Sequence, residues 1–346
     1  MTEPVLAATL LAIAILFALA VGVLLGHGAW LNARRRRVRP RMERGRAALR
    51  GVAAGDRVAP ADLATLRALP ASIRARLLVE LSRSLSGSSG AALGTLGRDL
   101  GVVQHAERRV RSPFWHRRLR GARVLTALRG EEAVMLPLFA DRNAAVRSQA
   151  AEWAAHHPSP RVVRALLDSL ARPGSGFAVR DSLLRLGPHA TAPLATFLAE
   201  RRGPEAAAAL ELATALPHPG LQPCALALCT DPHPPTRARA LRLLAAVGGG
   251  EGVASARAAL DDPDAGVRAA AASALGRSGE WSAAPVVARS LRDPSWEVRL
   301  AAAQALRAMG GPGHLLLRRY RDDEDRFAAD MARQTLDVAA LAEENG

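Results

Sequence analysis

The sequence predicts an all-α fold, a right-handed α-solenoid of stacked helical hairpins preceded by one transmembrane helix. Two observations lead to this prediction. Similar segments recur at an offset of 31 residues in the C-terminal part of the chain, and an offset of this size is typical of stacked repeats rather than of one globular core. An apolar run at the N-terminus, Val5–Leu25, has the length of a membrane-spanning helix.

The repeat is clearest in two segments that align residue for residue, DPDAGVRAAAASALGRSG (262–279) and DPSWEVRLAAAQALRAMG (293–310). A third copy, DPHPPTRARALRLLAAVG, occupies 231–248, another 31 residues back. Looser copies lie at 117–130, 141–157, 174–187 and, without the arginine, 203–218.

Each copy predicts a helix that follows an aspartate and ends at a glycine. We expect the aspartate to be the N-cap, a following proline to be the first helical residue, and the glycine to adopt the left-handed conformation after the helix. Segments between the copies, such as 279–293, carry a shorter apolar pattern, so the unit is predicted to be a helical hairpin with Val-Arg early in its second helix. One helical face is expected to be buried and consists of Val267, Ala270, Ala271, Ala274 and Leu275.

The pattern D-P-x(3)-V-R-x(2)-A-A-x-A-L-G at 262–276, with its weaker copies at 141, 231 and 293, resembles the HEAT-like repeat of the phycobilisome-lyase type. The resemblance covers roughly 113–346. It implies an α-solenoid in which aspartates and arginines of adjacent repeats pair along the array. It is specific for fold and poor for function, because such solenoids serve as scaffolds, adaptors and a few enzymes. The expected ladder residues are Asp141, Arg147, Arg180, Asp231, Arg237, Asp262, Arg268, Asp293 and Arg299.

The N-terminal run predicts an uncleaved membrane anchor. Val5–Leu25 holds no charge and no proline, and Trp30 follows at the expected interface. The basic run that begins with Arg34, Arg35, Arg36 and Arg37 should stay inside the cell and fix the topology. We therefore expect a single-pass protein of the inner (plasma) membrane, with its N-terminus outside, its repeats cytoplasmic, and anionic lipid headgroups near 34–46.

Four regions follow from these patterns. Residues 1–33 are predicted to be the anchor, 34–58 a basic juxtamembrane linker, 59–112 a divergent helical cap and 113–346 the repeat array. A cap is expected because the first repeat would otherwise expose an apolar face.

Charge is distributed unevenly between these regions. All 47 basic residues are arginine, and the net charge is +15. Residues 34–130 hold 23 arginines and 6 acidic residues, whereas 131–346 hold 24 and 25. A groove that follows a phosphate backbone along the repeats would need surplus arginine there, and the basic run before the repeats is interpreted as a topology determinant, so we expect no nucleic-acid partner.

No combination of residues predicts catalysis, a metal site or a cofactor. Cys224 and Cys229 lie five residues apart on one helix, which aims their sulfurs in different directions, so we interpret them as structural thiols. His156 and His157 are interpreted as capping residues at a helix C-terminus. The pairs of His and Glu that iron hydroxylases of this repeat class carry do not occur.

The sequence therefore predicts a membrane-anchored scaffold or adaptor that holds a protein partner, cytoplasmic or a membrane enzyme, on the concave face of its repeats. Two alternatives stay open, namely an enzyme resembling chromophore lyases and a nucleic-acid-binding HEAT-like protein. The anchor argues against the first, and the near-neutral array argues against the second.

Overall fold

The computed structural model is all-helical in the part of the chain that it describes. The chain divides into two compact units, Met1–Val134 (unit 1) and Met135–Gly346 (unit 2). The described residues are 16–17, 19–23, 25–27, 38–50, 58–83, 89–170 and 176–344.

The predicted membrane anchor requires a correction. Within the described ranges, no helix combines the length and the apolar character needed to cross a membrane, and a span needs about 20 consecutive apolar helical residues. The prediction of a single-pass inner-membrane protein with a cytoplasmic array is therefore wrong. Most of Val5–Leu25 and all of Arg34–Arg37 lie outside the described residues. The expected contact of 34–46 with lipid headgroups loses its basis together with the anchor.

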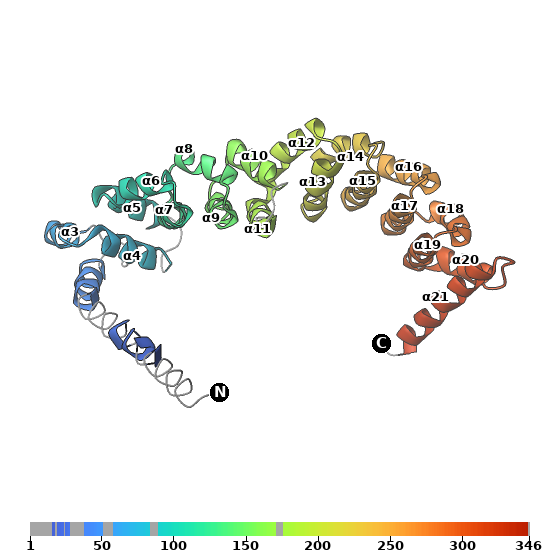
Figure 1. The fold of residues 1–346 in the computed structure, drawn as a ribbon. Coiled ribbons are helices and arrows are strands. Elements are labelled where there is room, and N and C mark those ends of the chain that lie inside the picture. Colours follow the sequence, from blue (N-terminus) through green and yellow to red (C-terminus); the bar gives the residue numbers. More distant parts are fainter. Residues whose placement is uncertain are drawn as a thin grey trace, which may run out of the picture. The chain divides into compact units, whose positions relative to one another are not determined.

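Unit 1 is built from short helices (Figure 1). Leucine and valine side chains are buried between them. The closest pair is α6 and α7, where a Cβ added at Gly121 would stand 2.7 Å from the carbonyl oxygen of Ala106. Helix α4 contacts both of them. A helical segment at 38–50 precedes the named helices, which are α3 (Pro60–Arg67), α4 (Ala71–Ser82), α5 (Ser89–Asp99), α6 (Val102–Val110) and α7 (Trp115–Ala127).

Unit 2 is built from helical hairpins in two rows (Figure 1). The second helix of each hairpin contacts the second helix of the next. This row consists of α9 (Ala144–Ala154), α11 (Gly176–Leu186), α13 (Gly203–Ala215), α15 (Pro234–Val247), α17 (Ala265–Ser278) and α19 (Trp296–Ala308). We call it the second-helix row.

The other row holds the first helices, several of which begin or end in a 3₁₀ turn. Its members are α10 (Pro160–Ser169), α12 (Thr191–Glu200), α14 (Gln222–Leu228), α16 (Gly250–Ala258), α18 (Ala284–Arg289) and α20 (Gly311–Tyr320). The 3₁₀ turns are η1 (Leu136–Ala140), η2 (Gly187–Ala190), η3 (Pro219–Leu221), η4 (Ala259–Asp261), η5 (Trp281–Ala283) and η6 (Ser290–Arg292). Helix α8 (Glu132–Met135) lies at the boundary of the units, and α21 (Arg326–Glu344) ends the array.

Small side chains let the second helices of unit 2 pack closely. The face predicted from the repeat is buried, with Val267 and Leu275 at 1% and 0% exposure. At Gly276, an added Cβ would stand 2.6 Å from Cα of Ala305 in the next helix. Any larger residue at 276 would push α17 and α19 apart.

The second helices begin later than the sequence predicts. Asp262 is not the N-cap of α17, because Asp264 fills that place and accepts a hydrogen bond from the Val267 N–H at 3.1 Å. Asp262 is extended, as a residue before proline must be, and its carboxylate accepts from the Asp264 N–H at 2.9 Å. Asp-Pro thus forms a turn that precedes the helix. The left-handed glycine predicted at the other end is confirmed at Gly279, with φ 68°.

Candidate functional site

The strongest polar contacts in unit 2 join consecutive repeats. Arg237 donates two hydrogen bonds to the carboxylate of Asp262, at 2.8 and 2.7 Å, and Arg268 donates two to Asp293, at 2.8 and 3.0 Å. These side chains are only 11–15% exposed. Planar forked pairs of this kind are strong because both partners are charged and aligned.

The same arginines also bind the turn of their own repeat. Nη1 of Arg268 donates to the carbonyls of Asp262 and Pro263, at 2.9 and 3.1 Å. Arg147, Arg237 and Arg299 bind the equivalent carbonyls of their own turns. One guanidinium therefore fixes the turn before its helix and, in two repeats, the aspartate of the next hairpin.

Other predicted ladder residues have different partners. Arg180 pairs with Glu211 at 2.8 Å rather than with an aspartate. Arg299 lies over the ring of Phe327, 4.9 Å from its centroid. Asp231 accepts from the Gly203 N–H at 3.1 Å, and Asp141 caps its own turn by accepting from Asn143 at 2.8 Å.

The paired aspartates stay ionised at neutral pH. Burial raises the pKa of Asp262 and of Asp293, but hydrogen bonds from Arg237 and Arg268, respectively, and from backbone N–H groups lower it by more. The pKa of each carboxyl is therefore below its ordinary value. The ladder is a charged contact throughout the physiological pH range.

The other residues singled out in the sequence have structural contacts. Cys224 donates to the Ala195 carbonyl at 3.3 Å, and burial raises the pKa of Cys229 to about 11. The His157 ring stacks on Trp153, with ring centroids 3.9 Å apart. Within the described ranges, no three His, Cys, Asp or Glu side chains are placed to share a metal ion.

One position on the second-helix row carries a polar side chain in every repeat. It is the fifth residue after the repeat arginine, or after Ala206 in the repeat that lacks one. Five of its six members are exposed and the one on α17 is half-buried. This polar row consists of Glu152, Arg185, Glu211, Arg242, Ser273 and Gln304.

The polar row differs in charge from repeat to repeat. Glu211 bonds to Arg180, but Arg242 forms no ion pair with a carboxylate in the described part of the chain. Arg277, on α17, is not a member of the row but is a second cation near Arg242. Burial of its guanidinium, followed by the nearby charge of Arg242, lowers the pKa of Arg277. Two like charges thus lie close together on α15 and α17.

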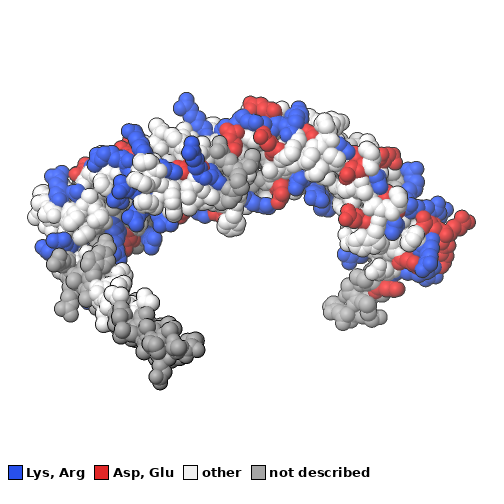
Figure 2. Space-filling model, viewed as in Figure 1, with Lys and Arg blue, Asp and Glu red and all other residues white. Residues whose placement is uncertain are grey.

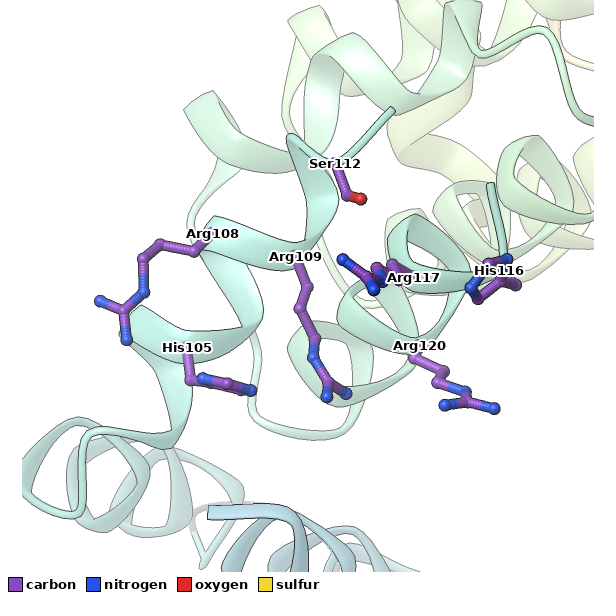
Figure 3. A pocket seen from close by; sticks show the side chains of 7 residues that line it. All are labelled: His105, Arg108, Arg109, Ser112, His116, Arg117 and Arg120. Carbon is purple, nitrogen blue, oxygen red and sulfur yellow. The ribbon is translucent and has the colours of Figure 1, made fainter. Parts of the chain in front are cut away.

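Unit 1 contains a cavity of about 640 Å³ between α6 and α7. Figure 3 shows the seven side chains that surround it, which come from α6, from the turn after it and from α7. None of them is acidic. They are His105, Arg108, Arg109, Ser112, His116, Arg117 and Arg120.

A second cavity of unit 1, of about 680 Å³, adjoins the first because Arg109 and Arg120 line both. It reaches α4 and the helical segment at 38–50. Its one carboxylate, Glu80, is paired with Arg46 at 2.7 Å. Its remaining charged lining is basic and consists of Arg76, Arg83 and Arg123.

The sequence prediction missed these cavities. The arginines of the second cavity come from segments far apart in the sequence, so no local motif connects them, whereas all seven residues around the first cavity lie within the arginine-rich stretch 105–120. The available signal was the excess of arginine over acidic residues in 34–130, which the predicted anchor explained as a topology determinant. Figure 2 shows arginines over α4–α7 with few acidic residues between them on the face that it draws.

Comparison with known proteins supports the repeat architecture. A family model described as HEAT repeats matches residues 253–337. The chain is similar to the karyopherin Kap121p, in a structure bound to the extreme C-terminus of the protein phosphatase Cdc14p, with 16% identity and a TM-score of 0.50. The match covers 81% of this chain and 38% of the karyopherin, so the chain spans well under half of that protein. At this identity the likeness shows the fold.

Two further solved structures are similar at lower TM-scores. The CpcE–CpcF complex of phycocyanin lyase from Nostoc sp. PCC7120 has 18% identity and a TM-score of 0.32, covering 68% of this chain and 94% of that chain. An engineered protein has 18% identity and a TM-score of 0.36, covering 79% and 87%. A comparison with curated protein sequences gave no match.

Proposed function

We propose that this protein is a scaffold or adaptor that binds a protein partner on the second-helix row of unit 2, and that it acts by binding rather than by catalysis. The observation that carries the proposal is the polar row, in which a constant backbone presents acidic, basic and neutral polar side chains at equivalent positions. Repeat proteins use such extended surfaces for binding. The karyopherin with a similar fold, bound to a phosphatase C-terminus, is consistent with this use.

The ladder suits this function because it keeps the row in register. Arg237 and Arg268 each bind two repeats, so the spacing of the exposed positions on α15, α17 and α19 is set by buried contacts. A preorganised surface loses less conformational entropy on binding. The charge pattern also indicates a complementary partner, with a carboxylate facing Arg242 and Arg277 and a basic group facing Glu152.

Affinity capture with the full chain tests this proposal. Reversing two charges of the row, Glu211→Arg with Arg242→Glu, should reduce recovery of the protein partner at least tenfold, because an interfacial like charge costs several kcal/mol. The matched control reverses two exposed charges on the first-helix side, Asp261→Arg with Arg289→Glu. This control keeps the net charge of the protein and should leave recovery of the partner unchanged.

Two results would contradict the scaffold function. One is equal partner recovery by the row variant and the control. The other is that nuclease treatment removes those captured proteins whose recovery the row variant reduces, since the row would then act through bridging nucleic acid. Unchanged melting temperatures of both variants show that the row, and not the fold, is being tested. The Glu211–Arg180 pair is exposed, so its loss has little effect on stability.

A further inference from the structure

Most arginines around the two cavities of unit 1 have no carboxylate partner among the described residues; Arg46, paired with Glu80, is the exception. Unit 1 holds 23 arginines and 9 acidic residues. Among the described residues, Arg108, Arg109, Arg117 and Arg120 form no ion pair with a carboxylate. Their charges converge on one concave surface, where an anionic ligand would replace the missing counter-charge.

The positive charges near the first cavity lower the pKa of His105. Burial lowers the pKa of His105, and the charges of Arg109, Arg108 and Arg74 lower it further. These three arginines lie on α6 and α4, so the positive potential spans more than one helix. It extends through Arg109 and Arg120 into the second cavity.

Exposed aromatic rings adjoin the first cavity. Phe114 and Trp115 are 53% and 49% exposed at the start of α7. The His116 ring lines the cavity, with its centroid 5.7 Å from that of Phe114 and 6.2 Å from that of Trp115. The Arg117 guanidinium lies 5.0 Å from the Phe114 ring centroid. Exposed aromatic rings beside a cationic cavity suit a ligand that has both negative charge and flat apolar faces.

We propose that the two cavities and the rings of residues 114–116 bind single-stranded nucleic acid. Arginine forks match phosphate oxygens in two-bond geometry, and the adjoining cavities have room for successive phosphates. The exposed rings stack on bases, whose faces are open only in a single strand. The site lies outside the near-neutral repeats, so it is independent of the proposed scaffold function.

Two other polyanions fit the observations less well. An acidic protein segment would bind the arginines but would leave the exposed rings without a role. An anionic bilayer presents its charges on a flat surface, which matches a concave lining between α4, α6 and α7 less well than a flexible strand does. Poly-glutamate and phosphatidylserine vesicles therefore serve as competing ligands in the test.

The test measures binding of fluorescent 15-nucleotide single-stranded RNA and DNA to the full chain across a salt series. Arg109→Gln with Arg120→Gln removes two phosphate contacts, so the slope of log affinity against log salt should become less steep by about 1.4. The control, Arg289→Gln with Arg307→Gln, removes two exposed arginines of unit 2 and should leave the slope unchanged.

A second variant tests the rings independently of charge. Trp115→Ala should weaken binding roughly 5- to 140-fold, the range for loss of one base–aromatic stack, without altering the salt slope. Circular dichroism and melting temperature check the fold of each variant. If the double variant does not fold, Arg117→Gln at an exposed position replaces it, with an expected slope change of about 0.7.

Three outcomes would overturn the proposal. The first is an equal loss of affinity in the unit 2 control, which would mean that only net charge matters. The second is full affinity in Trp115→Ala. The third is binding of poly-glutamate or vesicles that the cavity variants abolish, with no binding of either single strand.

Discussion

Arginine has opposite roles in the two units of this chain. In unit 2, arginines such as Arg237 and Arg268 are enclosed by a carboxylate and two carbonyls, and the 24 arginines are nearly balanced by 23 acidic residues. In unit 1, Arg109 and Arg120 line cavities without a carboxylate bonded to them. The difference indicates that an arginine held by a carboxylate or by backbone carbonyls stabilises the fold, whereas an arginine without such partners stays available to a ligand.

The largest expected effect is the loss of a ladder arginine. Arg268→Ala should lower the free energy of unfolding by about 2–3 kcal/mol, because it removes four hydrogen bonds and leaves the mostly buried Asp293 without its cation. Chemical denaturation measures the change. Arg307→Ala on the exposed face of α19 is the control and should change stability by less than about 0.5 kcal/mol.

Removal of a cavity arginine should have almost no effect on stability. Arg120→Gln is expected to change the free energy of unfolding by less than about 0.5 kcal/mol, with any change favouring the folded state because repulsion from neighbouring arginines falls. The same denaturation experiment applies. A loss of unfolding free energy as large as that in Arg268→Ala would show that Arg120 has a structural partner. It would contradict the difference between the arginines of the two units.

The smallest expected effect is a difference between the two units in how their stability changes as pH falls. The folded pKa of His105 lies below its ordinary value of 6.5, so the folded state favours the neutral imidazole. The contribution of His105 to the stability of unit 1 is therefore complete above pH 6.5 and is lost as pH falls below that value. Asp262 and Asp293 have folded pKa values below 3.8, so the ladder contributes fully above pH 3.8 and weakens only as pH falls from there. Hydrogen exchange at pH 7.5 and 5.5 should therefore show unit 1 loosening first, and His105→Gln should reduce that change.

The repeat period predicted the fold of unit 2 well because each repeat position has a physical cause. The apolar face of α17 and the glycine at 279 follow from helical periodicity and from backbone conformation. The helix start was misplaced because aspartate before proline can either cap a helix or form a turn. The following proline, the Asp264 N–H and Arg268 favour the turn within the repeat, and Arg237 of the preceding repeat adds two hydrogen bonds to Asp262 that a single repeat does not reveal.

The candidate sites were harder to predict because they depend on contacts between repeats or helices. The ladder positions followed from a family resemblance, yet Arg180 binds Glu211 and Arg299 covers Phe327. The second cavity of unit 1 unites residues of the helical segment at 38–50 and of α4, α6 and α7, which the sequence separates by tens of residues. The apolar N-terminal run led the sequence prediction to a membrane anchor. The excess of arginine after it was therefore interpreted as a topology determinant, and an arginine-lined cavity was not predicted.

Reaction with an arginine-selective dicarbonyl reagent, followed residue by residue by mass spectrometry, tests the central claim most directly. We expect fast modification of Arg108, Arg117 and Arg120, slowed by a single-stranded oligonucleotide, and slow modification of Arg237 and Arg268 with or without it. Equal rates for Arg120 and Arg268 in the free protein would contradict the claim that carboxylate pairing separates structural from available arginines.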